Sequence, residues 1–242
     1  MAQRIPTLDE YIFEQQMFEA GGQEAGKLEL VHTTLKSALA YANSIGWDPY
    51  KEIPDFDKNY KYAQDLAKLG FTQRKDMPVI TDADVKMLQY RLSKGFVDVH
   101  APFRGNNASA EDAFPEGLQG KMADEWLKNG LNDGSASDDK IKVQMKKVKV
   151  GDLKPIQQQI YFDKSIEGIA KFGADKSAEF YKKTFFITSS DNYIIDGHHR
   201  FLGACIIDPN MIVGALQIDL PIEKLLPMTK AYGDAIGNAR NL

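Results

Sequence analysis

The sequence predicts an α+β protein in which a helical N-terminal module, residues 1–100, precedes a small mixed-sheet domain, residues 141–242. Three observations support this prediction. Apolar residues recur at helical spacing in the first hundred positions. Residues 101–140 are rich in Gly, Asn, Ser and Asp, the composition of a loop-rich linker. From Ile141 onward, short segments of strand-like and helix-like pattern alternate.

The sequence pattern of the N-terminal module predicts four helices. "TLDE" at Thr7–Glu10 has the spacing of a capping box. Residues 28–46 place apolar side chains on one face and end at a glycine, which is typical of a helix C-terminus. "NYKYAQDLAKLG" ends at Gly70 in the same way, and "TDADVKMLQYRLSKG" begins at a capping threonine, Thr81, and ends at Gly95. "LQGKMADEWLKNG" predicts one short helix in the linker.

The C-terminal half mixes strands and helices. "IKVQMKKVKV" alternates like a half-buried strand, with a slip at Lys146 and Lys147 that would be a bulge or a turn. A loop and a helix follow in "GDLKPIQQQIYFDKSIEGIAKFG", and "FFITSSDNYIIDG" predicts a two-stranded hairpin. The remaining segments predict a helix in "HHRFLGACII", a strand in "ALQIDLP", and one or two helices in "IEKLLPMTKAYGDAIGN".

The composition limits which classes of protein this chain can belong to. The 242 residues are 43% hydrophobic and 26% charged, ordinary values for a globular chain. A net charge of −4 argues against a protein whose main task is to coat nucleic acid. The single cysteine, Cys205, excludes an internal disulfide and a cysteine-based zinc site, and we expect it to be a buried apolar residue. No apolar stretch approaches the roughly 18 residues of a membrane span, so we expect a cytoplasmic protein with no membrane partner.

One phosphate-binding motif is excluded near the start. "GGQEAGKL" at residues 21–28 fits G-x-x-x-x-G-K, but Leu28 stands where a Ser or Thr must bind magnesium. The segment before it has a helical pattern, whereas a P-loop follows a buried strand. We interpret the stretch as a glycine-rich connection between helices.

The strongest candidate site is the strand-to-helix turn in "YIIDGHHRFLGA". Gly197 allows a tight turn and a close approach of the backbone to a ligand. A helix that begins there points unpaired N–H groups and its positive dipole end at the turn. His198, His199 and Arg200 add donors that suit an anion, whereas Asp196 would be a metal ligand, a base or a partner of a histidine.

A structural interpretation of the same residues stays open. Successive residues on a regular helix point about 100° apart, so His198 and His199 cannot both face one ligand. One of the two would then cap the helix or pack. A polar cluster that lies at this turn by chance is the alternative.

This turn resembles the nucleotide-binding signature of the ParB/sulfiredoxin superfamily. The Asp-Gly-His-His-Arg version is similar to that of archaeal free-serine kinases and of phage-encoded ParB-like proteins. Upstream, "VKVGDLKPIQQQIYFDKSI" looks like the first strand, the Leu-Lys-Pro turn and the following helix of that superfamily. The resemblance covers about residues 141–240 and implies a ParB/sulfiredoxin-like nucleotide-binding domain.

The resemblance also implies roles for individual residues. Gly197, His198, His199 and Arg200 would hold the phosphates of ATP or another nucleotide, and Lys154 and Gln157 would contact the nucleotide from the Leu-Lys-Pro segment. Asp196, His198 and His199 are the expected catalytic residues, with Asp196 also the expected Mg²⁺ ligand.

Two departures from the family pattern limit what the resemblance implies. His198 stands where sulfiredoxins have their cysteine, so the resemblance does not extend to sulfinic acid reduction. Gln157 or Gln158 stands where the serine kinases have a glutamate base, and an amide cannot accept the proton. Either Asp196 is the base or the chemistry differs.

Three functions compete at this stage. The first is a nucleotide-binding phosphotransferase, kinase-like and dependent on ATP or ADP, or a nucleotide hydrolase, with an unknown acceptor. The second is a DNA-binding or nuclease-like protein, because the lysines between positions 142 and 154 form a basic run, although such runs usually face water. The third is a non-enzymatic interaction protein whose helical module binds a partner.

Overall fold

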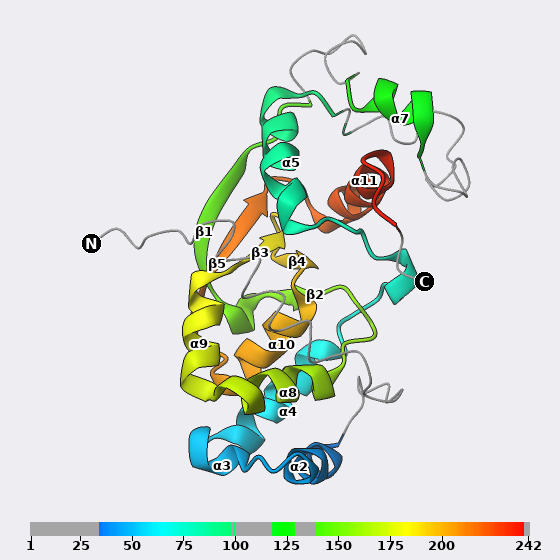
Figure 1. Cartoon of the computed structure of the whole chain (residues 1–242). Coiled ribbons are helices and arrows are strands. Elements are labelled where there is room, and N and C mark those ends of the chain that lie inside the picture. Colours follow the sequence, from blue (N-terminus) through cyan, green and yellow to red (C-terminus); the bar gives the residue numbers. More distant parts are fainter. Residues whose placement is uncertain (1–33, 98, 100–117, 129–138, 240–242) are drawn as a thin grey trace. The chain divides into compact units, whose positions relative to one another are not determined.

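The computed structural model describes residues 34–97, 99, 118–128 and 139–239 (Figure 1). The chain divides into two compact units that are interleaved along the sequence. The first unit comprises the residues up to Phe71, Lys146–Phe186 and Gly197–Ala215. The second comprises Thr72–Met145, Ile187–Asp196 and the residues from Leu216 onward. The limits predicted from composition, 1–100, 101–140 and 141–242, stay a prediction.

The described strands form one five-stranded mixed sheet in the order β1-β5-β3-β4-β2. In chain order they are β1 (Val143–Lys149), β2 (Lys154–Pro155), β3 (Phe185–Thr188), β4 (Tyr193–Asp196) and β5 (Ile212–Ile218). The predicted hairpin is confirmed, because β3 and β4 pair antiparallel with Ile187 opposite Asp196. Its turn places Asn192 at a φ of 69°, a conformation that asparagine tolerates better than most residues. The predicted first strand is confirmed as well, and it runs without a break through Lys146 and Lys147.

The first unit is built around helix α10 (His198–Ile207), which packs against α4, α8 and α9 (Figure 1). The apolar sequence of α10 explains this central place, since a helix that is apolar on most of its surface is stable only when buried. Residues 201–206 of this helix are fully buried. The other helices of this unit are α2 (Leu35–Ser44), α3 (Pro49–Glu52), α4 (Phe56–Ala67), η3 (Val150–Asp152), α8 (Phe162–Phe172) and α9 (Ala174–Lys183).

A row of aromatic rings connects the helices before Phe71 to α8. The Phe56 ring meets Trp47 edge-on at 6.0 Å and Tyr60 at 5.7 Å. Tyr60 in turn contacts Phe162, the first residue of α8, with ring centroids 5.0 Å apart. Phe56, Tyr60 and Phe162 are fully buried, so this row is part of the hydrophobic core that holds α8 in place.

The second unit contains α5 (Asp82–Lys94), α7 (Gly120–Trp126), α11 (Ile222–Ala235) and the short helix η2 (Arg74–Asp76). Thr81 and Asp84 form a capping box at the start of α5, and Gly95 ends the helix in the left-handed conformation, as the sequence predicts. Figure 1 shows α11 close to α5 and α7. An Arg91 Nη1 hydrogen bond to the Tyr232 hydroxyl, 3.0 Å long, joins α5 to α11.

Most of the predicted helices that fall on described residues are confirmed. Helices α3 and α9 were not predicted. The segments that end at Gly46 and Gly70 contain α2 and α4, and the last predicted segment forms the single helix α11. Helix α9 was missed: the prediction ended at Gly173, and α9 starts directly after it with a mostly charged and polar sequence. The predicted cap at Thr7 and the glycine-rich stretch at 21–28 lie outside the described residues.

Within the described ranges, none of the helices has the length and apolar character needed to cross a bilayer.

We expect Gly233→Ala to destabilise the second unit. In a helix interior this exchange normally stabilises by about 1 kcal/mol. Here the added Cβ would lie 2.7 Å from the Val79 carbonyl oxygen, a backbone atom that cannot move alone. The net result should be a loss of about 1–3 kcal/mol in the free energy of unfolding, measured by urea titration. Glu223→Ala, an exposed change on the same helix, is the control, and its change in the free energy of unfolding should be near zero. A Gly233→Ala protein as stable as this control would contradict the packing of Gly233 against Val79.

Candidate functional site

The candidate site begins at Gly197, between the end of β4 and the start of α10. Gly197 has a φ of +102°, which side chains other than hydrogen rarely allow. A Cβ here would lie 2.8 Å from the Phe186 ring and 3.1 Å from Nη2 of Arg200. The Arg200 guanidinium therefore lies back against the turn from which its own helix starts. Glycine is required here both by the backbone and by the two side chains that pack on it.

His198 is the first residue of α10 and is only 4% exposed. Its Nε2 atom lies 3.2 Å from the backbone nitrogen of Ile156 and 3.4 Å from that of Gln157, and accepts hydrogen bonds from both. An imidazole nitrogen accepts only when it carries no proton. His198 is therefore neutral, with its proton on Nδ1, and it fixes the start of the loop between β2 and α8.

His199 binds the other end of the same loop. Its Nε2 atom accepts a hydrogen bond from the backbone N–H of Tyr161 at 3.3 Å, and the two rings are parallel within 4° with centroids 5.9 Å apart. Its backbone carbonyl accepts a 3.0 Å hydrogen bond from the Ser165 hydroxyl in the first turn of α8. His199 thus joins the first turns of α8 and α10.

The loop that the two histidines hold, Ile156–Tyr161, also contacts the segment that follows α4. The Phe71 N–H donates to the Ile156 carbonyl at 2.8 Å, and Gly70 lies so close that a Cβ would be 2.2 Å from the Gln157 carbonyl oxygen. Within the loop, the Gln157 side-chain amide donates to the Gln159 carbonyl. We call this segment the glutamine loop. The two histidines bind both ends of its backbone, and the Gln157 side-chain amide binds the middle.

Burial is the main reason that His198 is neutral, and nearby positive charges add to the effect. Burial lowers the pKa of His198 to about 3, and the nearby charges of His199 and Arg200 act in the same direction. Burial raises the pKa of the Tyr181 hydroxyl, and the Arg200 charge opposes this rise in part. Positive charge at this corner is therefore supplied by Arg200 and not by His198.

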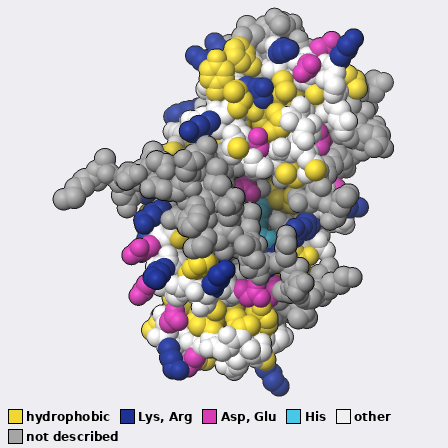
Figure 2. Space-filling model, in the orientation of Figure 1, with side chains coloured by type: hydrophobic (Ala, Val, Ile, Leu, Met, Phe, Trp, Pro, Cys, Tyr) yellow, Lys and Arg dark blue, Asp and Glu magenta, His cyan; other side chains and the backbone are white. Residues whose placement is uncertain are grey.

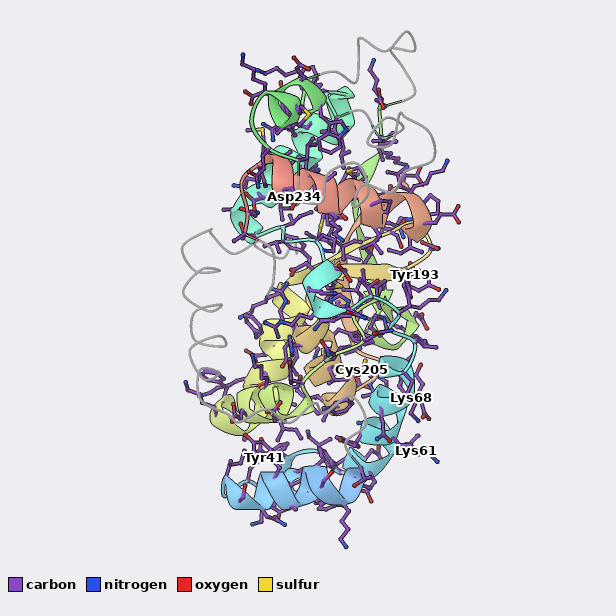
Figure 3. All side chains as sticks on the ribbon, turned by 90° about the vertical axis from the view of Figure 1, so that its right-hand side faces the viewer. Tyr41, Lys61, Lys68, Tyr193, Cys205 and Asp234 are labelled. Carbon is purple, nitrogen blue, oxygen red and sulfur yellow. The ribbon has the colours of Figure 1, made fainter. Side chains whose placement is uncertain are left out.

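A buried carboxylate that the sequence prediction missed lies in the first turn of α8. Asp163 is 4% exposed, and its Oδ1 accepts the Lys164 N–H at 2.8 Å. Burial raises the pKa of the Asp163 carboxyl, and the charge of Glu167 one turn later adds to the rise. Glu167 itself accepts a hydrogen bond from the Tyr41 hydroxyl of α2, a residue labelled in Figure 3. An acid in the first turn of a helix suits the dipole, but its position in the sequence does not show that it is buried.

The structure places the predicted site residues as follows. Gly197, His198, His199 and Arg200 lie at one corner of the first unit, and Gln157 joins them through the hydrogen bond of its N–H to His198. Lys154 is half-buried on β2, before the glutamine loop. Asp196 ends β4 in the second unit, and its predicted catalytic and metal-binding roles stay predictions.

Three further observations bear on the site. Cys205, labelled on α10 in Figure 3, is fully buried, as expected, and burial raises the pKa of its thiol. Figure 2 shows histidine atoms (cyan) at the surface of one face, so part of this corner reaches solvent. Among the residues that the structure describes, no three His, Cys, Asp or Glu side chains gather in a group that could hold a metal ion by itself.

No protein-family model, curated protein or solved structure matches the chain.

We expect acid to destabilise the protein through His198. Its pKa falls from about 6.5 in the unfolded chain to about 3 in the fold, so between these values only the unfolded state binds the proton. Stability should be complete above pH ~6.5 and decline as the pH falls, with about 2 kcal/mol lost to this group by pH 5. His198→Gln places a carbonyl oxygen that cannot titrate where Nε2 accepts, so its unfolding free energy should fall less over the same range. Parallel pH curves for the two proteins would contradict the buried neutral histidine.

Proposed function

We propose that this chain is a nucleotide-binding phosphotransferase or nucleotide hydrolase that holds the phosphates at the N-terminal end of α10. The observation that supports the proposal most directly is the junction of two helix starts. The first turns of α8 and α10 are joined at His199, and each helix directs its positive dipole end and its first N–H groups toward its N-terminus. The helices have eleven and ten residues, so both carry an appreciable dipole.

Side-chain charge at these helix starts suits the same ligand. Arg200 lies in the first turn of α10 against Gly197, where a planar guanidinium can bind two phosphate oxygens at once. Lys164 lies in the first turn of α8, with its ammonium 5.4 Å from the centre of the Tyr161 ring. Phosphoryl transfer depends mainly on position and on neutralised charge, and these groups supply both.

The histidines have a positioning role in this proposal. Both Nε2 atoms accept backbone N–H groups of the glutamine loop, and in this proposal the phosphates contact Arg200 and backbone N–H groups. The resemblance to the ParB/sulfiredoxin superfamily, whose signature lies at the same kind of turn, adds support. Mg²⁺ suits the proposal as a companion of the nucleotide, because it is commonly held by one or two carboxylates together with phosphate oxygens and water. Asp196 would be the carboxylate.

Arg200→Ala tests the proposal. Loss of a charge-assisted bidentate contact is worth about 1.5–3 kcal/mol, so we expect ATP or ADP to bind ~10- to 150-fold more weakly. Calorimetry with ATP, ADP and CTP, each with Mg²⁺, measures the affinity. Lys171→Ala is the matched control, since it removes one exposed positive charge at the opposite end of α8 and should leave the affinity unchanged. If the folded wild-type protein binds none of the three nucleotides, the proposed function is wrong.

DNA binding is the second candidate, because four lysines of the basic run are exposed. They lie on β1 or directly before it, and β1 is an edge strand of the sheet: Lys142, Lys146, Lys147 and Lys149. If these lysines bind phosphates of DNA, replacing Lys146 and Lys147 by Ala should reduce the slope of log affinity against log salt by about 2. A gel-shift titration at several salt concentrations measures the slope. Absence of a shift at low salt removes this candidate, and absence of both DNA and nucleotide binding would favour a non-enzymatic interaction protein.

A further inference from the structure

The aromatic ring of Tyr161 lies at the junction of the two helix starts and has no role in the proposed function so far. Tyr161 is the N-cap residue of α8, and its N–H donates to Nε2 of His199 at 3.3 Å. Its ring is parallel to the His199 imidazole within 4°, with centroids 5.9 Å apart. Both residues belong to the first unit, and both are partly exposed to solvent. The junction therefore carries two parallel aromatic rings at its surface.

The Tyr161 ring is also next to one of the positive groups that suit the phosphates. The Lys164 ammonium lies 5.4 Å from the centre of this ring, within the range of a cation–π contact. In a nucleotide, only the ribose separates the base from the α-phosphate. Phosphates held at the starts of α8 and α10 therefore leave the base within reach of the Tyr161 ring.

We propose that the Tyr161 ring is the surface on which the base of the nucleotide stacks. The inference rests on the proposed function, and it names what the site selects: a nucleotide in preference to inorganic polyphosphate. Stacking on an aromatic ring accepts any base, because every base has a flat π face. The hydrogen bond to His199 fixes the backbone from which the ring projects, so less ordering accompanies stacking.

Tyr161→Ala tests this inference with two ligands that differ in the presence of a base. We expect this variant to bind ATP with Mg²⁺ ~5- to 150-fold more weakly than the wild type, the usual contribution of a base stacked on an aromatic side chain. Inorganic tripolyphosphate with Mg²⁺ has no base and should bind both proteins alike. Tyr161→Phe keeps the ring and should bind ATP as the wild type does. Calorimetry measures the affinities.

Phe172→Ala is the matched control for the loss of a ring. Phe172 ends α8, and the Lys171 ammonium lies 5.4 Å from the centre of its ring. The opposite end of the same helix thus carries the same kind of cation–ring pair, and removing its ring should leave the ATP affinity unchanged. The thermal midpoint of each variant shows whether it is folded at the temperature of the titration.

Tyr161→Trp gives a direct signal of stacking. A base stacked on an indole quenches its fluorescence, so ATP should lower the emission of this variant more than that of the wild type, whose tryptophans are Trp47 and Trp126. Tripolyphosphate should not lower it.

The outcomes separate this inference from the proposed function. If the wild type binds ATP and Tyr161→Ala binds it with equal affinity, the inference is wrong while the proposed function stands. The same holds if ATP quenches Tyr161→Trp no more than the wild type. It also holds if Tyr161→Ala loses affinity for ATP and tripolyphosphate equally, because the ring then only supports the loop. If the wild type binds no nucleotide, both are wrong.

Discussion

Hydrogen bonds from loop N–H groups to two imidazole nitrogens are the constraint on which the candidate site depends. A loop that runs over a protein must satisfy its backbone donors, and here three of them, at Ile156, Gln157 and Tyr161, are satisfied by adjacent residues of α10. Because the acceptors are the first two residues of that helix, hydrogen bonds join the loop to the starts of both helices. The histidines position the helix ends, and Arg200 supplies positive charge beside Gly197.

The sequence allowed much of this fold to be predicted. The hairpin of β3 and β4, helix α5 and helix α10 were confirmed because each carries local signals: a turn rich in polar residues, a capping box, or a glycine at an end. Helix α9 lacked such a signal at its start, because Gly173 marks both the end of α8 and the beginning of α9.

The chemistry of the site could be predicted only in part. Gly197 was predicted from its own conformational freedom, which is a local property. The orientation of His198 and His199 was not, since it depends on where Ile156 and Tyr161 lie about forty residues earlier in the chain. Asp163 was missed for the same reason: an aspartate in a first turn is usually exposed, and only the tertiary fold buries it.

The lysines along β1 also affect whether a strand of another molecule can add to the sheet. An edge strand offers a row of backbone groups to which a strand of another molecule could add, the first step toward aggregation. Any such addition would bring the exposed side chains of Lys146, Lys147 and Lys149 close to a second set of like charges and partly strip their water. Charged side chains on an edge strand disfavour such an addition.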